Sequence, residues 1–182
     1  MNFIKIRDNL LTKKECSDAI KWSCDNKDFH ADVNKVEHSG YDYYDLMDIG
    51  EDPLICFDPV PLRPLFHAIN SLRESYIKSF PSVKILDTWS LDYVRFKYWK
   101  PGEYYSVWHS EHGASDRLSR VLSFLIYLSD NDSQTEFMNH RNVRTKAGRG
   151  VIFPAYFTHT HRGSVCKKGL DRYIVSGYYS FL

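Results

Sequence analysis

Two short segments of the chain contain side chains that could bind a metal ion. The first holds His109 and Glu111, separated by one residue, and the second holds His159 and His161. In a β-strand, residues two apart project to the same face, so His109 and Glu111 could bind one ion together. A histidine of the second segment would add another imidazole. Two imidazoles and one carboxylate leave part of the coordination sphere open, so that reactants can reach the ion.

This ligand set is the one that non-haem Fe(II) oxygenases use on one face of their iron. An H-x-E pair is weak by itself, because a chain with 8 His and 23 acidic residues can contain one by chance. Structural zinc is a poorer interpretation, since such sites prefer four closed ligands that often include Cys. Neither segment has a nearby cysteine, and the four cysteines form no C-x-x-C pair. Whether this pair binds iron must therefore be judged from the sequence motifs around it.

Composition indicates a chain of one domain with no preference for polyanions. Its 182 residues are enough to bury a substantial core. With 24 basic and 23 acidic side chains the net charge is +1, so neither nucleic acid nor an anionic membrane is expected as a partner. No apolar run approaches the ~20 residues of a membrane span. The first residues lack the apolar core of a signal peptide, and a cytoplasmic location is expected.

The N-terminal part shows helical patterns. A short strand is expected at Phe3–Arg7, followed by a helix that begins at a capping box formed by Thr12 and Glu15. A second helix is expected where apolar residues recur at helical spacing from Leu62 to Ile77. Residues 29–59 are acidic, aromatic and aperiodic, which predicts a loop or a pair of short strands. The tyrosine-rich part of this stretch, residues 41–45, is a candidate lid, although a solvated surface loop is the simpler interpretation.

From Lys84 onward the apolar pattern has the period of β-strands. Turn signals separate the expected strands, which are Lys84–Thr88, Leu91–Trp99, Val121–Leu128, Thr135–Met138, Gly150–Phe153 and Arg172–Phe181. Many short strands after two helices, with no alternation of strand and helix, argue against a parallel sheet. They favour a mainly β protein with flanking helices, of the jelly-roll or a related double-sheet type.

Several motifs follow one another in the C-terminal half. In order, they are Tyr98–Gly102 ahead of the H-x-E pair, Phe124–Asp130, Thr135–Phe137, Gly150–Pro154 with His159–Gly163, and Arg172–Tyr173 ahead of Val175–Tyr178. Each match is modest, but their order and spacing are specific. The chain resembles the prolyl 4-hydroxylase-like branch of the 2-oxoglutarate/Fe(II) oxygenases.

The resemblance implies a double-stranded β-helix (jelly roll) that binds Fe(II), 2-oxoglutarate and O₂ and hydroxylates an unactivated C–H bond. Ascorbate is the candidate reductant. The resemblance also implies a single oxygenase domain over residues 1–182, with 1–83 as helical support and lid region and 84–182 as most of the β-helix core. The family's Gly-Gly is replaced here by Ser133-Gln134, and its commoner Asp ligand by Glu111. The substrate, a small molecule, a peptide or a protein, is therefore left open.

The resemblance also bears on the choice of the second histidine. The family places a glycine two residues after its distal histidine and a basic residue further on. Counting from His161 gives Gly163 and Arg172, which fit this spacing better than a count from His159. The expected metal ligands, and with them the catalytic residues, are therefore His109, Glu111 and His161. His159 is the runner-up, and His112 is a weaker competitor.

Arg172 is the expected anchor of the oxoacid. The free carboxylate of 2-oxoglutarate needs a charge-assisted partner once it is desolvated, and Arg offers a planar bidentate fork. Arg172, Ile174 and Ser176 share one strand face, so Ser176 could add a hydroxyl donor. Alternation along their strands also points Tyr98 and Tyr127 into the same pocket, although each tyrosine could equally be core packing.

Two alternatives remain from the sequence. An iron enzyme of this kind could act on a prolyl or other amino-acid residue, on a free amino acid or on another small metabolite. Alternatively, a jelly roll could serve as a non-catalytic metal- or ligand-binding module, because fold alone does not fix function. Turnover of 2-oxoglutarate to succinate would separate the enzyme from the module.

Overall fold

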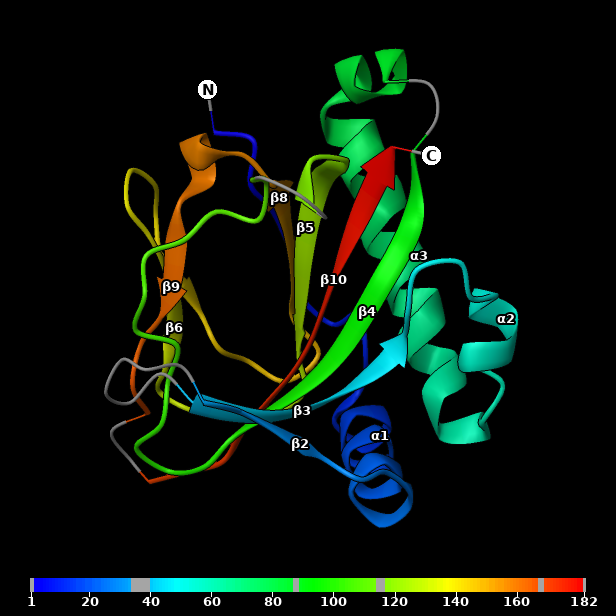
Figure 1. The fold of residues 1–182 in the computed structure, drawn as a ribbon, viewed down its shortest axis with the longest axis vertical. Coiled ribbons are helices and arrows are strands. Elements are labelled where there is room, and N and C mark those ends of the chain that lie inside the picture. Colours follow the sequence, from blue (N-terminus) through cyan, green and yellow to red (C-terminus); the bar gives the residue numbers. More distant parts are fainter. Residues whose placement is uncertain (1, 34–39, 87–88, 114–116, 167–168, 182) are drawn as a thin grey trace.

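A seven-stranded antiparallel sheet and a three-stranded antiparallel sheet pack face to face in the computed structural model (Figure 1). The structure describes residues 2–33, 40–86, 89–113, 117–166 and 169–181. The large sheet has the strand order β1-β8-β5-β10-β4-β3-β2 and the small sheet the order β7-β6-β9. The strands are β1 (Lys5–Arg7), β2 (His30–Val33), β3 (Gly40–Met47), β4 (Trp89–Trp99), β5 (Arg120–Tyr127), β6 (Gln134–Phe137), β7 (Val143–Arg144), β8 (Gly150–Pro154), β9 (His161–Gly163) and β10 (Arg172–Phe181). The predicted mainly β jelly roll is confirmed.

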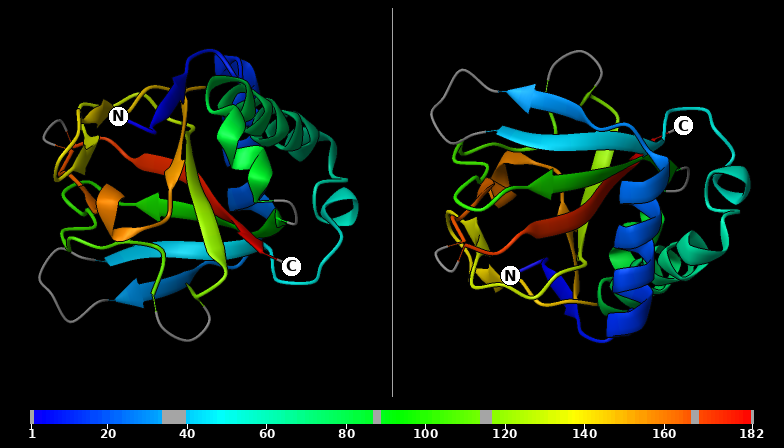
Figure 2. Two further views of the ribbon diagram at one scale, coloured as in Figure 1. Left: turned by 90° about the horizontal axis from the view of Figure 1, so that it is seen from above. Right: turned by 90° about the horizontal axis from the view of Figure 1, so that it is seen from below.

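The helices cover the outer face of the large sheet (Figure 2). They are α1 (Lys13–Asn26), α2 (Pro53–Cys56) and α3 (Arg63–Ser79), with 3₁₀ helices η1 (Val60–Leu62) and η2 (Pro81–Ile85). A further 3₁₀ helix, η4 (Phe157–His159), lies apart from them, between β8 and β9. The predicted capping box starts α1: the Thr12 hydroxyl accepts from the Glu15 amide, and the Glu15 carboxylate accepts from the Thr12 amide at 2.7 Å. In the described part of the chain, no helix is both long and apolar enough to cross a bilayer.

The large sheet is buried on both faces. Toward the helices, Phe96 of β4 and Phe124 of β5 pack in a core that includes Leu72 of α3. Between the sheets, Tyr127 and Ile174 of the large sheet join a second core with Phe137 of the small one. Because side chains alternate along each strand, consecutive residues of β4, β5, β8 and β10 point into opposite cores. Both faces of the large sheet are therefore apolar, so an apolar face does not by itself show which side lines the cavity.

Two predicted elements differ from the structure. The expected strand at Lys84–Thr88 is wrong where it is described: Lys84 lies in η2, which begins at Pro81, and residues 87–88 lie outside the described chain. Pro81 has a fixed φ and no amide donor, which suits the first turn of a helix better than a ladder. Residues 41–45 belong to β3 inside the large sheet, so they form neither a lid nor a surface loop.

Candidate functional site

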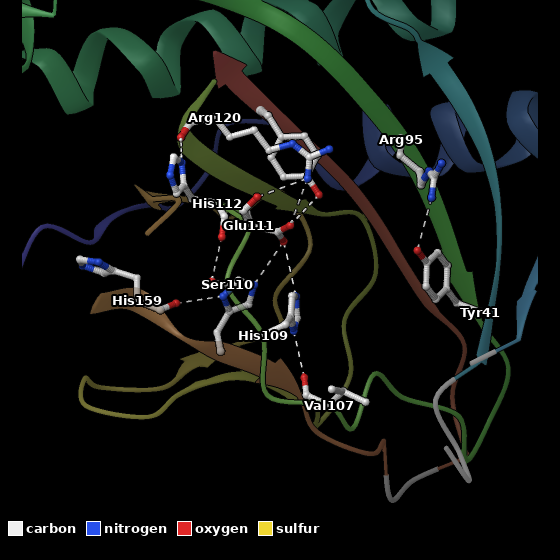
Figure 3. A network of polar contacts seen from close by, with 11 residues as sticks. Tyr41, Arg95, Val107, His109, Ser110, Glu111, His112, Arg120 and His159 are labelled. Carbon is white, nitrogen blue, oxygen red and sulfur yellow. Dashed lines mark hydrogen bonds and ion pairs between the residues drawn. The ribbon is translucent and has the colours of Figure 1, made fainter. Parts of the chain in front are cut away.

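His109, Glu111 and His161 converge on one point, and Figure 3 shows His109 and Glu111 directed toward each other. One ligand atom from each of the three lies within 4.8 Å of the others. Oε1 of Glu111 is 3.5 Å from Nε2 of His109 and 3.6 Å from Nε2 of His161. Atoms that each lie about 2.0–2.2 Å from one ion are roughly 3 Å apart. Small side-chain adjustments would therefore suffice for a shared ion.

Backbone pairing brings these side chains together. His109 and His161 form an isolated antiparallel bridge, with N···O distances of 3.0 and 2.9 Å between their main chains. The amide of Glu111 then bonds to the carbonyl of Ala155 instead of continuing along β9. The expectation that His109 and Glu111 share a regular strand is wrong, because the ladder ends after one bridge. The turn away from β9 still leaves both side chains aimed at the same point.

Hydrogen bonds fix which nitrogen of each imidazole is free. Nδ1 of His109 lies 2.9 Å from the carbonyl oxygen of Val107, and Nδ1 of His161 lies 3.0 Å from that of His159. A carbonyl oxygen only accepts, so Nδ1 holds the proton in both rings and donates it. Both Nε2 atoms then present a lone pair toward Glu111. Metal-binding histidines are commonly oriented in this way.

The charge states of the cluster also suit a metal ligand set. Burial alone would raise the pKa of Glu111, but its interactions with His109 and His161 outweigh burial and hold this pKa well below its ordinary value. Burial lowers the pKa of His161 even though Glu111 acts in the opposite direction. An ionised carboxylate and a neutral imidazole are the forms that bind metals.

The two competing histidines lie elsewhere. His159 is in η4, where its ring stacks on His140 with centroids 4.7 Å apart, and Figure 3 shows it turned away from Glu111. Burial lowers the pKa of His159 to about 4, so this ring is also neutral. His112 places Nδ1 against the carbonyl of Arg120, and its ring lies on Tyr156. The structure thus brings His161, and neither His159 nor His112, to Glu111.

A cavity of about 630 Å³ opens beside the cluster and reaches Arg172 at the start of β10. Arg172 is only 3% exposed, and its guanidinium carbon lies 5.3 Å from the centre of the Trp99 ring. Among the described residues, Nε of Arg172 has no hydrogen-bond partner, and the groups that interact with its charge, Tyr127 and Cys166, are not carboxylates. A buried cation without a counter-charge is costly, which makes the site attractive to an anion.

Ser176 and Tyr127 lie in the same interior. Ser176 is buried between its cross-strand partners Leu125 and Arg95, which line the cavity, and its hydroxyl has no partner in the described chain. Tyr127 is fully buried, and its hydroxyl lies 2.7 Å from that of Thr135. The structure therefore places both residues on the cavity side of the large sheet.

The prediction for Tyr98 is wrong. Its hydroxyl donates to Asp171, and its ring stacks on Tyr173 with centroids 4.7 Å apart on the outer face of the sheet. The apolar alternation of Val94 and Phe96 marks the face toward the helices. Trp99, on the opposite face of the same strand, lines the cavity instead.

Some cavity residues were missed by sequence reasoning. Tyr178 lies one strand period beyond Ser176, and this alternation alone could have indicated it. On the far wall, Asp45 of β3 binds Arg95 in a bidentate pair with N···O distances of 2.7 and 3.1 Å and also accepts from Tyr93. Nothing local predicts this pair, because it depends on how β3 and β4 align.

Comparisons with known proteins agree with this geometry. Residues 94–180 match the sequence profile of the 2OG-Fe(II) oxygenase superfamily. No curated protein sequence matches the chain closely enough to count as a relative. The matched segment contains all three converging residues, and the fold around it is the expected jelly roll, so this part of the chain is similar to the 2OG-Fe(II) oxygenase superfamily.

Solved structures show the same fold across the whole chain. The viral collagen prolyl hydroxylase from Paramecium bursaria Chlorella virus-1, solved with 2OG, has a TM-score of 0.70 at 16% identity, covering 99% of this chain and 97% of its own. The Trichoplax adhaerens prolyl hydroxylase, in complex with a hypoxia inducible factor peptide fragment, has a TM-score of 0.63 at 15% identity, covering 100% and 84%. The alpha-ketoglutarate-dependent epimerase SnoN from nogalamycin biosynthesis has a TM-score of 0.69 at 13% identity, covering 99% and 79%.

Proposed function

We propose that the protein is a 2-oxoglutarate- and Fe(II)-dependent dioxygenase that hydroxylates an unactivated C–H bond. One observation supports this most strongly: two imidazoles and one carboxylate converge beside a cavity that is also lined by Arg172, a buried arginine whose Nε has no hydrogen-bond partner among the described residues. The metal cluster and the arginine both line the same cavity. This is the arrangement that a chelating oxoacid with a second carboxylate requires.

The residues present fit Fe(II). His109 and His161 would bind through Nε2 and Glu111 through Oε1, with their lone pairs already oriented. Two nitrogens and one oxygen on one side of the ion leave positions for the oxoacid and for O₂. When bound, the iron supplies the oxidising chemistry, driven by decarboxylation of the oxoacid. The protein's part is to orient the reactants and exclude water from them.

The residues at the inner end of the cavity fit 2-oxoglutarate. Arg172 would pair with its distal carboxylate, and the unpartnered Ser176 hydroxyl would donate a further hydrogen bond. The indole nitrogen of Trp99 is also buried without a partner in the described chain, so it is another available donor. Tyr127 packs close enough to Arg172 to interact with it electrostatically and would help shape this end.

A prolyl or other amino-acid residue is the substrate class that the fold neighbours suggest. Two of them are prolyl hydroxylases, and one was solved with a peptide. A cavity of about 630 Å³ leaves room for a side chain or a small molecule beside the oxoacid. The epimerase SnoN has the same fold, so the choice among a peptide, a protein and a small metabolite has to be made by experiment.

The deciding experiment is turnover of 2-oxoglutarate by the Fe(II)-loaded protein, with ascorbate added as the proposed reductant. Succinate should form slowly without substrate and faster when a true substrate is present. Omission of Fe(II), or replacement by Zn²⁺, should abolish succinate formation. Binding of Fe(II) without any turnover would instead support the non-catalytic module.

The substrate can then be sought with prolyl peptides, free amino acids and small carboxylic acids, each followed by mass spectrometry. A gain of one oxygen that matches the extra succinate identifies the substrate. If extra succinate appears without any oxygen in the product, hydroxylation is the wrong reaction, although the cofactor assignment stands.

A further inference from the structure

The two carboxylate oxygens of Glu111 have different surroundings. Oε1 faces the Nε2 atoms of His109 and His161 at 3.5 and 3.6 Å. Oε2 accepts a hydrogen bond of 2.9 Å from the hydroxyl of Tyr178 and lies 3.7 Å from Nη1 of Arg120. One oxygen is thus directed at the candidate metal position, and the other is held from the opposite side (Figure 3).

Tyr178 has little freedom to leave this position. It is 7% exposed and projects from the middle of the large sheet on β10. Its ring stacks on Tyr93 with centroids 5.7 Å apart, and the guanidinium carbon of Arg120 lies 3.9 Å from its ring centre. Because aromatic and cationic groups cover the ring, the phenol oxygen stays fixed beside Glu111.

Arg120 is anchored to the same segment. Its Nη1 reaches the backbone carbonyl of Glu111 at 3.5 Å, and its own carbonyl accepts from Nδ1 of His112 at 3.2 Å. The first residue of β5 therefore holds both the main chain and the side chain of Glu111. This ties the position of the carboxylate to the large sheet.

We propose that Tyr178, assisted by Arg120, is a positioning residue that restricts Glu111 to binding the metal through Oε1 alone. The inference rests on the function proposed above. A carboxylate can bind a metal through one oxygen or through both. Binding through both would occupy a position that the oxoacid and O₂ need. Holding Oε2 by a hydrogen bond keeps that position open.

The identity of residue 111 follows from the same arrangement. An aspartate is one methylene shorter, so from the same backbone position its carboxylate would lie farther from the two histidines and from Tyr178. A glutamate spans both contacts. The effect of the Tyr178 hydroxyl on metal affinity should therefore depend on a glutamate at residue 111, and this dependence can be measured.

The test compares Tyr178→Phe with Tyr179→Phe in the full-length protein. Tyr178→Phe removes the hydroxyl but keeps the ring between Tyr93 and Arg120. Tyr179→Phe is the matched control, because Tyr179 points toward the helices and its hydroxyl donates to the carbonyl of Ile69, away from Glu111. Affinity for Fe(II) and Mn²⁺, measured by competition with a chelator, should fall roughly 10–100-fold in Tyr178→Phe. It should be unchanged in Tyr179→Phe.

Coordination itself provides a second readout. The absorption band of the anaerobic Fe(II)·2-oxoglutarate complex reports on the ligands of the metal. It should shift or weaken in Tyr178→Phe and remain as in wild type in Tyr179→Phe. Equal affinity and an equal spectrum for Tyr178→Phe and wild type would overturn the inference.

A double-substitution cycle tests the dependence on Glu111. In a Glu111→Asp background, Tyr178→Phe should change metal affinity by less than about twofold, because the shorter carboxylate no longer reaches the hydroxyl. If the free-energy losses of metal binding in Glu111→Asp and Tyr178→Phe simply add in the double variant, the two side chains are not in direct contact. If wild type binds metal and forms succinate while these outcomes fail, only the positioning role is wrong. If wild type does neither, the proposed function itself is wrong.

Discussion

The guanidinium of Arg172 lies directly against Gly163, where a Cβ atom would come within 2.9 Å of Nη1. Gly163 ends β9, the strand that begins with His161. The absence of a side chain at residue 163 therefore allows the arginine of the large sheet to approach the small sheet. Through this contact, the short strand β9 links the candidate oxoacid anchor on β10 to the candidate metal ligand His161.

Gly163→Ala should weaken 2-oxoglutarate binding without loss of iron. The added methyl group would push Arg172 away and cost about one charge-assisted hydrogen bond, or about 1.5–3 kcal/mol. The 2-oxoglutarate concentration needed for half-maximal succinate formation should rise roughly tenfold or more. An unchanged oxoacid requirement would mean that Arg172 does not bind it from this position.

Arg172→Ala should raise the oxoacid requirement further, and Arg172→Lys should restore only part of it. Lysine retains the charge but lacks the planar fork that matches a carboxylate. Titration of 2-oxoglutarate at saturating Fe(II) measures the effect, and metal affinity measured by chelator competition is the control. Should both variants keep wild-type affinity for 2-oxoglutarate, another residue must be its anchor.

His161→Ala should abolish tight iron retention, whereas His159→Ala should leave most of it. His161 directs Nε2 toward Glu111, but His159 stacks on His140 outside the cluster. Iron content after dialysis and chelator competition both measure the difference. The reverse result would transfer the ligand assignment to His159.

Metal binding should raise the thermal stability of the protein. A ligand that binds only the folded state stabilises it by about 2.7 kcal/mol when present at 100 times its Kd. For a chain of this size the melting temperature should rise by roughly 5–10 °C. Mn²⁺ is a suitable probe because it does not oxidise readily. The rise should disappear in His161→Ala, and an equal rise in that variant would place the metal elsewhere.

Thr12→Ala should reduce stability without affecting the site. It removes the hydroxyl that accepts from the Glu15 amide at the start of α1, and loss of such a cap costs roughly 1 kcal/mol. Chemical denaturation measures the loss, and succinate formation at low temperature serves as the control. A stable variant with reduced turnover would mean that α1 has a role beyond support.

The sequence by itself determined much of the architecture. Strand periodicity located β4, β5, β6, β8 and β10, and the spacing of polar and apolar residues located α1 and α3. These signals are local, because propensity, capping and alternation act over a few residues. The short β7 and β9 were missed, since two or three residues are too few to show a period.

The site was predicted unevenly, for a similar reason. Motif order pointed to His109, Glu111, His161 and Arg172, and strand alternation to Ser176. Alternation misled at Tyr98, because the large sheet is buried on both faces and its more apolar face is the one toward the helices. A pattern of period two separates two faces but does not say which of them lines a cavity.

Only the tertiary structure decided which side chains meet. The bridge between His109 and His161, the bond from Tyr178 to Glu111 and the approach of Arg172 to Gly163 all join segments far apart in the chain. Such contacts depend on the register between strands and on the packing of one sheet against the other. No short stretch of sequence contains that information, because it arises only when the whole core closes.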